Sequence, residues 1–342
     1  MKAVFIEQFD GVPGVRYGDV PDLIRADDEV LVKMEYASLN HHDIYSARGE
    51  AGQYALPLVL GCDGVGTVLE APAGSSFRPG EHVVMYPVVS CGNCMYCALG
   101  LEHRCFSFGM VGGERQGTFA EHVSLPEKNL VRLPEALSPE IAACLPVAGL
   151  TAWNMVQVEG RVKSGEHILV MGASGGVGVI AVLLLKSMGA VVYAHTSKSD
   201  KAGFLRELGA DHVFDGVGGL INILKVASGL PHRGFDAALN YVGGKNWRYV
   251  LPSIRSSGRI YTCGAVGGAV AEIDQRQVFY RQLSIFGCSM GSRSAMEHML
   301  DYFTQHRKMS IPVDSVVGLP SVGAAMAKME SGNVLGKIVV QI

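Results

Sequence analysis

Four cysteines lie within fifteen residues of one another, in the segment CGNCMYCALGLEHRC. They are Cys91, Cys94, Cys97 and Cys105, with the spacing C-x2-C-x2-C-x7-C. Four thiolates this close together can fill all four positions of a tetrahedral Zn²⁺ ion, which leaves none open for a reactant. The spacing therefore predicts a structural zinc site, with His103 as a bystander in the same loop. Disulfides are the alternative, but neighbouring cysteines in a C-x-x-C turn pair poorly with each other.

A second chemically informative stretch is the glycine-rich sequence GASGGVG at residues 172–178. A short apolar run precedes it at 167–171, an apolar segment of helical length follows to Met188, and a second apolar run occupies 191–195. Strand, glycine turn, helix and strand together predict a βαβ unit that binds the pyrophosphate of a dinucleotide at the helix N-terminus. A tight turn without a ligand is the alternative. The residues expected at the dinucleotide are Ala173, Ser174, Gly175, Gly176, Val177 and Gly178.

The end of the second strand predicts which dinucleotide is bound. Sites for NAD usually place an Asp or Glu about 20 residues past the glycine turn, on the ribose 2′-hydroxyl. This chain has Thr196, Ser197 and Lys198 there. Hydroxyls and an ammonium group would accept a 2′-phosphate that a carboxylate would repel. We therefore expect NADP(H), although Lys198 could equally be an ordinary solvated lysine.

Composition limits the remaining possibilities. The 342 residues suffice for two domains, and the 48% hydrophobic content permits sizeable cores. A net charge of −3 without a basic tail does not indicate nucleic-acid binding. The longest apolar run, Val177–Leu185, is too short to span a membrane, and the first residues show no secretion signal. These features predict a cytoplasmic protein that acts on a small molecule.

The pattern of expected secondary structure divides the chain into two parts. Up to about residue 147, short strand-like runs such as Met1–Ile6 and Glu29–Tyr36 alternate with glycine turns, which predicts a small β-rich domain. After the βαβ unit, strand-like runs recur at 211–214, 235–240, 258–262 and 283–287 with helical segments between them. Six strands in this pattern predict an α/β fold with a doubly wound parallel sheet.

Taken together, these motifs resemble the medium-chain dehydrogenase/reductase superfamily over nearly the whole chain. The resemblance implies a GroES-like catalytic domain at residues 1–147, a Rossmann domain at 148–288, and a return segment at 289–342 that completes the first domain. It also implies a homodimer or homotetramer that pairs through the strand near Leu283–Gly287. It is carried by the four-cysteine segment and by EVLVKMEYASLNHHD, LVLGCDGVGTV, FRPGEHV, GTFAEHV, LPVAGLTAW, GASGGVG and LGKIVV.

The superfamily contains zinc alcohol dehydrogenases and zinc-free quinone or enoyl reductases. The positions that match the catalytic zinc ligands are Asn40, Cys62 followed by Asp63, and Val147. A valine cannot bind a metal, and a catalytic zinc needs three protein ligands. The resemblance to quinone oxidoreductases is closer at these places, although the four-cysteine segment is a departure from that group.

The resemblance also implies roles for individual residues. Tyr45 is expected to donate a hydrogen bond to a substrate carbonyl and Asn40 to anchor it, whereas Asp43 is expected to hold its own loop through backbone N–H groups. Thr151 would pack against the nicotinamide, and His41 and Lys337 would contact the pyrophosphate.

The predicted function is hydride transfer from NADPH to a quinone or an α,β-unsaturated carbonyl without a catalytic zinc. Two alternatives stay open. One is an alcohol dehydrogenase whose zinc site is repaired by His41 or His42. The other is a protein that binds NADPH without turnover.

Overall fold

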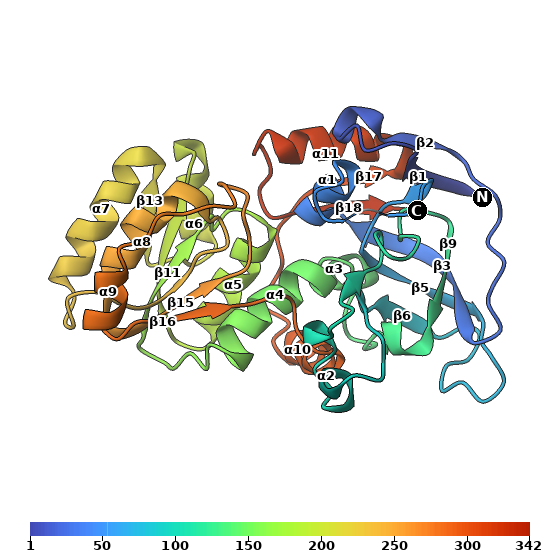
Figure 1. Ribbon diagram of the computed structural model, residues 1–342, viewed down its shortest axis with the longest axis horizontal. Coiled ribbons are helices and arrows are strands. Elements are labelled where there is room, and N and C mark those ends of the chain that lie inside the picture. Colours follow the sequence, from blue (N-terminus) through green and yellow to red (C-terminus); the bar gives the residue numbers. More distant parts are fainter. Residues whose placement is uncertain (53) are drawn as a thin grey trace. The chain divides into compact units, whose positions relative to one another are not determined.

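The computed structural model describes residues 1–52 and 54–342 and divides the chain into two compact units. The first unit comprises Met1–Leu150 and Gly291–Ile342, and the second comprises Thr151–Met290. Figure 1 colours the first unit mostly blue, teal and red, and the second mostly green, yellow and orange. The first unit therefore contains both the beginning and the end of the chain.

The first unit is built around a seven-stranded sheet in which strand β3 is central. Its ten residues bury most of their apolar side chains, as the alternation of EVLVKMEYAS predicts. The last strand pairs antiparallel with β3 through Val339 and Ser38, so the return segment completes the sheet. The strands are β3 (Glu29–Ser38), β5 (Asp63–Glu70), β6 (His82–Met85), β9 (His122–Pro126), β10 (Leu130–Arg132), β17 (Val313–Gly318) and β18 (Lys337–Gln341).

Smaller elements complete this unit. The three-stranded sheet contains β1 (Lys2–Ile6), β2 (Arg16–Asp19) and β4 (Leu58–Val59), and the two-stranded sheet contains β7 (Val88–Val89) and β8 (Gly109–Met110). The helices are α1 (His41–Ala47), α2 (Met95–Ala98), α3 (Pro139–Ala142), α10 (Arg293–Gln305) and α11 (Val322–Glu330). Buried side chains of α11, β18 and α1 share one hydrophobic core, which ties the return segment to the start of the chain.

The second unit contains the six-stranded parallel sheet that the sequence predicts, in the order β13-β12-β11-β14-β15-β16. The order reverses between β11 and β14, and ligands of doubly wound sheets bind at this switch point, beside the carboxyl ends of the strands. The strands are β11 (His167–Met171), β12 (Val191–Thr196), β13 (His212–Asp215), β14 (Phe235–Leu239), β15 (Ile254–Thr262) and β16 (Ser284–Gly287).

Helices cover this sheet, and β14 is buried along its whole length, as expected for a strand covered on both faces. The helices are α4 (Leu150–Trp153), which begins at the boundary between the units, α5 (Gly176–Ser187), α6 (Ala202–Glu207), α7 (Gly216–Gly229), α8 (Trp247–Ser253) and α9 (Gln275–Tyr280). None of the helices in the described part of the chain is long and apolar enough to cross a membrane.

Candidate functional site

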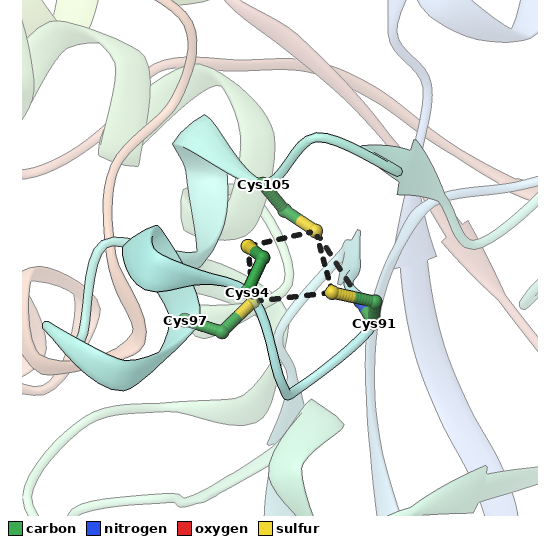
Figure 2. Close-up of side chains that lie close together, drawn as sticks. All are labelled: Cys91, Cys94, Cys97 and Cys105. Carbon is green, nitrogen blue, oxygen red and sulfur yellow. Dashed lines mark hydrogen bonds between the residues drawn. The ribbon is translucent and has the colours of Figure 1, made fainter.

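The four predicted metal ligands converge in the first unit, and Figure 2 shows their sulfur atoms turned toward one another. All four Sγ atoms lie within 4.8 Å of one another. Four of the separations are 3.4 Å for Cys91–Cys105, 3.6 Å for Cys94–Cys97, 3.8 Å for Cys94–Cys105 and 4.0 Å for Cys91–Cys97. A tetrahedron with Zn–S bonds of about 2.3 Å has edges of about 3.8 Å. The arrangement therefore fits one Zn²⁺, whereas a disulfide needs sulfurs about 2.05 Å apart.

Backbone N–H groups stabilise negative charge on these sulfurs. Hydrogen bonds from the N–H groups of Cys97 and Phe106 lower the pKa of the Cys94 thiol to about 6. The N–H of Asn93 lowers the pKa of Cys91. Desolvation has the opposite effect on Cys97 and raises its pKa to about 11. Thiolate is the form that binds metal, so the loop is organised for a cation.

A buried ion pair forms a second polar centre in the same unit. Lys337, the first residue of β18, is 2% exposed, and Asp63, the first residue of β5, is 0% exposed. The Lys337 ammonium donates to Leu39 O at 2.8 Å, to Asn40 Oδ1 at 2.8 Å and to Asp63 Oδ2 at 3.2 Å. These three bonds occupy all of its N–H donors.

The Asp63 carboxylate joins the residues that match the zinc ligands of alcohol dehydrogenases. It accepts hydrogen bonds from Asn40 Nδ2 at 2.8 Å and from the Val147 N–H at 2.8 Å. It also accepts one from Ser38 Oγ at 2.7 Å. Cys62 lies beside this network, with its Sγ 3.6 Å from Asn40 Nδ2. The four positions that match the zinc-site residues of alcohol dehydrogenases therefore lie together, but they are joined to one another by hydrogen bonds.

Two of the predicted roles conflict with this network. Lys337 has no N–H donor left for a pyrophosphate, and burial removes it from solvent. The Asn40 amide is engaged at both ends, because its oxygen accepts from Lys337 and its nitrogen donates to Asp63. Both residues therefore act within the protein here, and neither offers a free donor to a ligand.

Asp43 holds the loop before α1, as the sequence predicts. Its Oδ2 accepts the N–H of Asn40, the residue at the N-cap of α1, at 2.8 Å. Burial raises the pKa of this carboxyl to about 7, against the opposing effect of that N–H. The Cys62 thiol donates to Asp43 Oδ1 at 3.5 Å, and burial raises its pKa well above the usual value. Cys62 is thus a neutral thiol near pH 7.

Helix α1 also carries the predicted phenol donor. Tyr45 is half-buried, and burial raises the pKa of its hydroxyl, which is protonated at neutral pH as an ordinary phenol is. The exposed His41 lies beside it, with the two ring centroids 6.5 Å apart. A second phenol, Tyr54, was not predicted. It interacts with Ser46 of α1, and burial raises its pKa to about 12.

In the second unit, the glycine turn joins β11 to α5. Gly172 has φ 67°, a left-handed conformation that favours glycine, and Gly175 is the N-cap of α5. A Cβ on Gly178 would lie 2.5 Å from Ala173 O, so only glycine allows the helix this close approach. A Cβ on Gly175 would meet only Gly172 O, at 3.6 Å, so its outer side is open. The first residues of α5, Gly176 and Val177, place helix N–H groups beside this opening.

The residues expected around the ribose lie beside this turn. Thr196 ends β12, and its hydroxyl is 3.2 Å from that of Ser174, in a buried pair. Ser197 is exposed and Lys198 is half-buried, immediately after the strand. Thr151 is buried in α4. The structure therefore brings Ser174 and Thr196 together at the carboxyl edge of the sheet.

Sequence reasoning missed two polar residues at the switch point. Asn240 and Tyr241 follow β14 directly, next to the turn after β11. The sequence contained a clue to them. Polar residues after a strand-like run are followed by Gly243-Gly244, much as Ser174 after β11 is followed by two glycines. The strand order that makes them neighbours of the glycine turn was not available from the local pattern.

Comparison with known proteins assigns the family. Residues 26–135 match the alcohol dehydrogenase GroES-like domain, and residues 176–305 match the zinc-binding dehydrogenase domain. The chain is 35% identical to a solved NAD-dependent alcohol dehydrogenase, with a TM-score of 0.92 and full coverage of both chains.

Curated relatives extend the comparison to two activities. The chain is 27% identical over 336 residues to the acryloyl-coenzyme A reductase of Sulfurisphaera tokodaii, covering 96% of this chain and 98% of the relative. It is 28% identical over 346 residues to an alcohol dehydrogenase of Geobacillus stearothermophilus, covering 100% and 99%. The chain therefore belongs to the medium-chain dehydrogenase/reductase superfamily of oxidoreductases.

Proposed function

We propose that this protein is an NADPH-dependent reductase of a quinone or an α,β-unsaturated carbonyl that works without a catalytic zinc. One observation carries the proposal. The positions that would hold such a zinc are linked to each other through the Asp63 carboxylate and the Lys337 ammonium. A metal at this place would have to displace a buried ion pair and deprotonate Cys62, whose thiol pKa is strongly raised.

The relatives support a reduction of this kind. Acryloyl-coenzyme A, named in the Sulfurisphaera tokodaii relative, is an α,β-unsaturated thioester. Such an acceptor is already electrophilic at its β-carbon, so it does not need a metal to polarise it. The alcohol dehydrogenase relatives favour the competing proposal of a zinc-dependent alcohol oxidation.

NADPH would supply the hydride in this reaction. The protein's task is to stabilise the negative charge that develops on the acceptor's oxygen. Tyr45 is our candidate, because its protonated hydroxyl is a hydrogen-bond donor at neutral pH. Tyr54 is a second candidate, through its interaction with Ser46 of α1. Asn40 leaves the proposed catalytic set because its amide is already engaged.

The proposed dinucleotide site consists of the turn at 172–178, the N-terminus of α5, and the end of β12. The hydroxyls of Ser174 and Thr196 and the ammonium of Lys198 support NADP(H), since no carboxylate ends β12. The cofactor contacts that the family resemblance implies for His41 and Thr151 stay predictions, and Lys337 leaves the proposed set. The NAD-dependent relative supports the opposite preference, so measuring kcat/KM with NADPH and NADH decides between them.

The four-cysteine loop is proposed to bind one structural Zn²⁺. The S–S separations fit the tetrahedral geometry, and backbone N–H groups favour the thiolate form of Cys91 and Cys94. This site would be closed to substrate, because all four ligands come from the protein.

We also propose that the protein forms a homodimer through the edge of its six-stranded sheet. Strand β16 is the last in the order and is mostly exposed, with Ile285 facing outward. Exposed edge strands and apolar patches mark surfaces that pair with another chain. Light scattering of wild type and Ile285→Lys tests this, and a wild-type monomer would contradict it. The exposed apolar residues on the preceding segment are Val266, Val270, Ile273, Phe279 and Tyr280.

Zinc content and turnover together test the proposed function. Protein purified without added metal should contain one zinc per chain, oxidise NADPH only when quinone or enone is present, and leave simple alcohols unreacted. Two zincs per chain with chelator-sensitive alcohol oxidation would establish the alcohol dehydrogenase alternative. Tight NADPH binding with no turnover across the acceptor panel would instead indicate a non-catalytic NADPH-binding protein.

A further inference from the structure

Two buried hydrogen-bond donors at the switch point of the sheet have no partner within residues 1–52 and 54–342. One is the side-chain amide nitrogen of Asn240, a residue that is 0% exposed. The other is the hydroxyl of Tyr241, a residue that is half-buried but whose hydroxyl oxygen is itself buried. Buried polar groups are nearly always paired in native proteins, so two neighbouring exceptions call for an explanation.

Tyr241 lies against the turn that is proposed to hold the dinucleotide, and Asn240 precedes it at the end of β14. Leu239 pairs with Val170, so the next residues of β14 run beside the end of β11. The Tyr241 ring lies 3.3 Å from the place of a Cβ on Gly172. Its hydroxyl lies 2.3 Å from the place of a Cβ on Gly178, in the first turn of α5. The phenol is thus packed onto the glycine turn itself.

This region presents hydrogen-bond donors without matching acceptors. The first N–H groups of α5 have no intrahelical acceptor, and the helix dipole adds partial positive charge there. Burial raises the pKa of Tyr241 well above its usual value, so the hydroxyl keeps its proton. The Asn240 oxygen accepts the Gly243 N–H at 3.3 Å, which leaves the amide N–H groups as the free end. Donors without acceptors match a ligand that is rich in oxygen and negatively charged.

We propose that Tyr241 donates a hydrogen bond to a phosphate oxygen of the bound dinucleotide, with the Asn240 amide as a second donor. This inference rests on the proposed function only in requiring that a dinucleotide binds at the glycine turn. It adds two side-chain donors to the backbone N–H groups that the glycine turn and the start of α5 supply. It also explains why the ligand-free protein tolerates two unpaired donors, since the ligand pairs them.

Tyr241→Phe tests the proposal through two opposite effects. Removing an unpaired buried hydroxyl should raise the melting temperature of the ligand-free protein by about 2 °C or more. The same change should weaken NADPH binding at least about tenfold, because a hydrogen bond to a charged phosphate is lost. Binding of adenosine 2′-phosphate, which has no 5′-phosphate, should not change. Asn240→Asp, which replaces the donor by an acceptor of similar size, should also weaken NADPH binding.

Tyr193→Phe is the matched control in the same sheet. Its hydroxyl is 3.0 Å from His167 Nδ1 and so already has a partner inside the protein. This variant should lose stability and keep its NADPH affinity, the reverse of Tyr241→Phe.

Fluorescence titration with NADPH and NADH distinguishes a failure of the proposed function from a failure of the inference about Tyr241 and Asn240. If wild type binds neither, the proposed function fails. If wild type binds but Tyr241→Phe and Asn240→Asp bind equally well, this inference alone is overturned, and the donors are paired by buried water.

Discussion

Replacing Lys337 by methionine is expected to destabilise the first unit by about 3–5 kcal/mol, the cost of removing one partner from a buried ion pair. The change removes the ammonium from Asp63 and leaves the Leu39 carbonyl and the Asn40 amide oxygen without their donor. Asp63 keeps three hydrogen bonds but loses the ammonium that balances its charge. Methionine preserves most of the side-chain volume, so the loss of stability measures the contribution of the ammonium charge and its hydrogen bonds.

The assay must report on the unit that contains Lys337. Both tryptophans, Trp153 and Trp247, lie in the second unit, so intrinsic fluorescence would follow the wrong transition. Hydrogen exchange of the β18 amides, measured against urea concentration, reads the free energy of opening directly. Lys2→Met is the control, because its ion pair with Asp19 is exposed and should contribute little.

A double variant separates charge from packing. Asp63→Asn in the Lys337→Met background removes the unpaired charge, so the double variant should be less destabilised than the sum of the two single changes. The reasoning would be refuted if Lys337→Met left β18 as protected as in wild type and weakened NADPH binding. That outcome would return Lys337 to the pyrophosphate, where the family resemblance first placed it.

Four further results are expected. Cys94→Ser should abolish zinc binding, measured by metal analysis, whereas Cys263→Ser, outside the cluster, should retain it. Thr196→Asp should lower kcat/KM for NADPH relative to NADH by about tenfold or more, because a carboxylate repels the 2′-phosphate; an unchanged ratio would mean that the ribose pocket lies elsewhere. Tyr45→Phe should lower kcat about 100-fold with unchanged NADPH affinity, as for loss of an oxyanion donor, and intact turnover would remove Tyr45 from the mechanism. Asp43 has a pKa raised to about 7 in the folded protein, so folding takes up a proton between about pH 4 and pH 7, and stability falls as pH rises through that range. Asp43→Asn should flatten this dependence in urea titrations, and parallel curves would contradict the assignment.

The parts of the fold that were predictable are those encoded within short stretches. The βαβ unit follows from apolar runs on either side of GASGGVG, because backbone geometry there depends on neighbouring residues. The cysteine cluster is equally local, since its ligands span fifteen residues and need no distant partner. The six-stranded parallel sheet follows from repeating the same unit.

The buried network was not predictable in the same way. Lys337 and Asp63 are separated by 274 positions and meet only because β18 returns to pair with β3. A lysine near the end of a chain is most often exposed, and family resemblance suggested a ligand contact. The hydrogen bonds of Asn40 could not be predicted for the same reason, because its two partners come from different parts of the chain. Tyr241 required the strand order before its contact with Gly172 and Gly178 could be seen.

Charge balance explains why this network argues for metal-independent chemistry. A zinc site built from two thiolates and a histidine brings two negative charges, which the Zn²⁺ ion neutralises. Here the corresponding positions carry a neutral amide, a neutral thiol and a backbone N–H, from Asn40, Cys62 and Val147. Asp63, the residue after Cys62, carries a carboxylate that pairs with the Lys337 ammonium. A divalent cation that took Asp63 or Asn40 as a ligand would have to replace hydrogen bonds that these two side chains already make to each other and to Ser38, Val147 and Lys337. This is why we propose an acceptor that takes hydride without metal activation, with the Tyr45 phenol as the proposed hydrogen-bond donor to its oxygen.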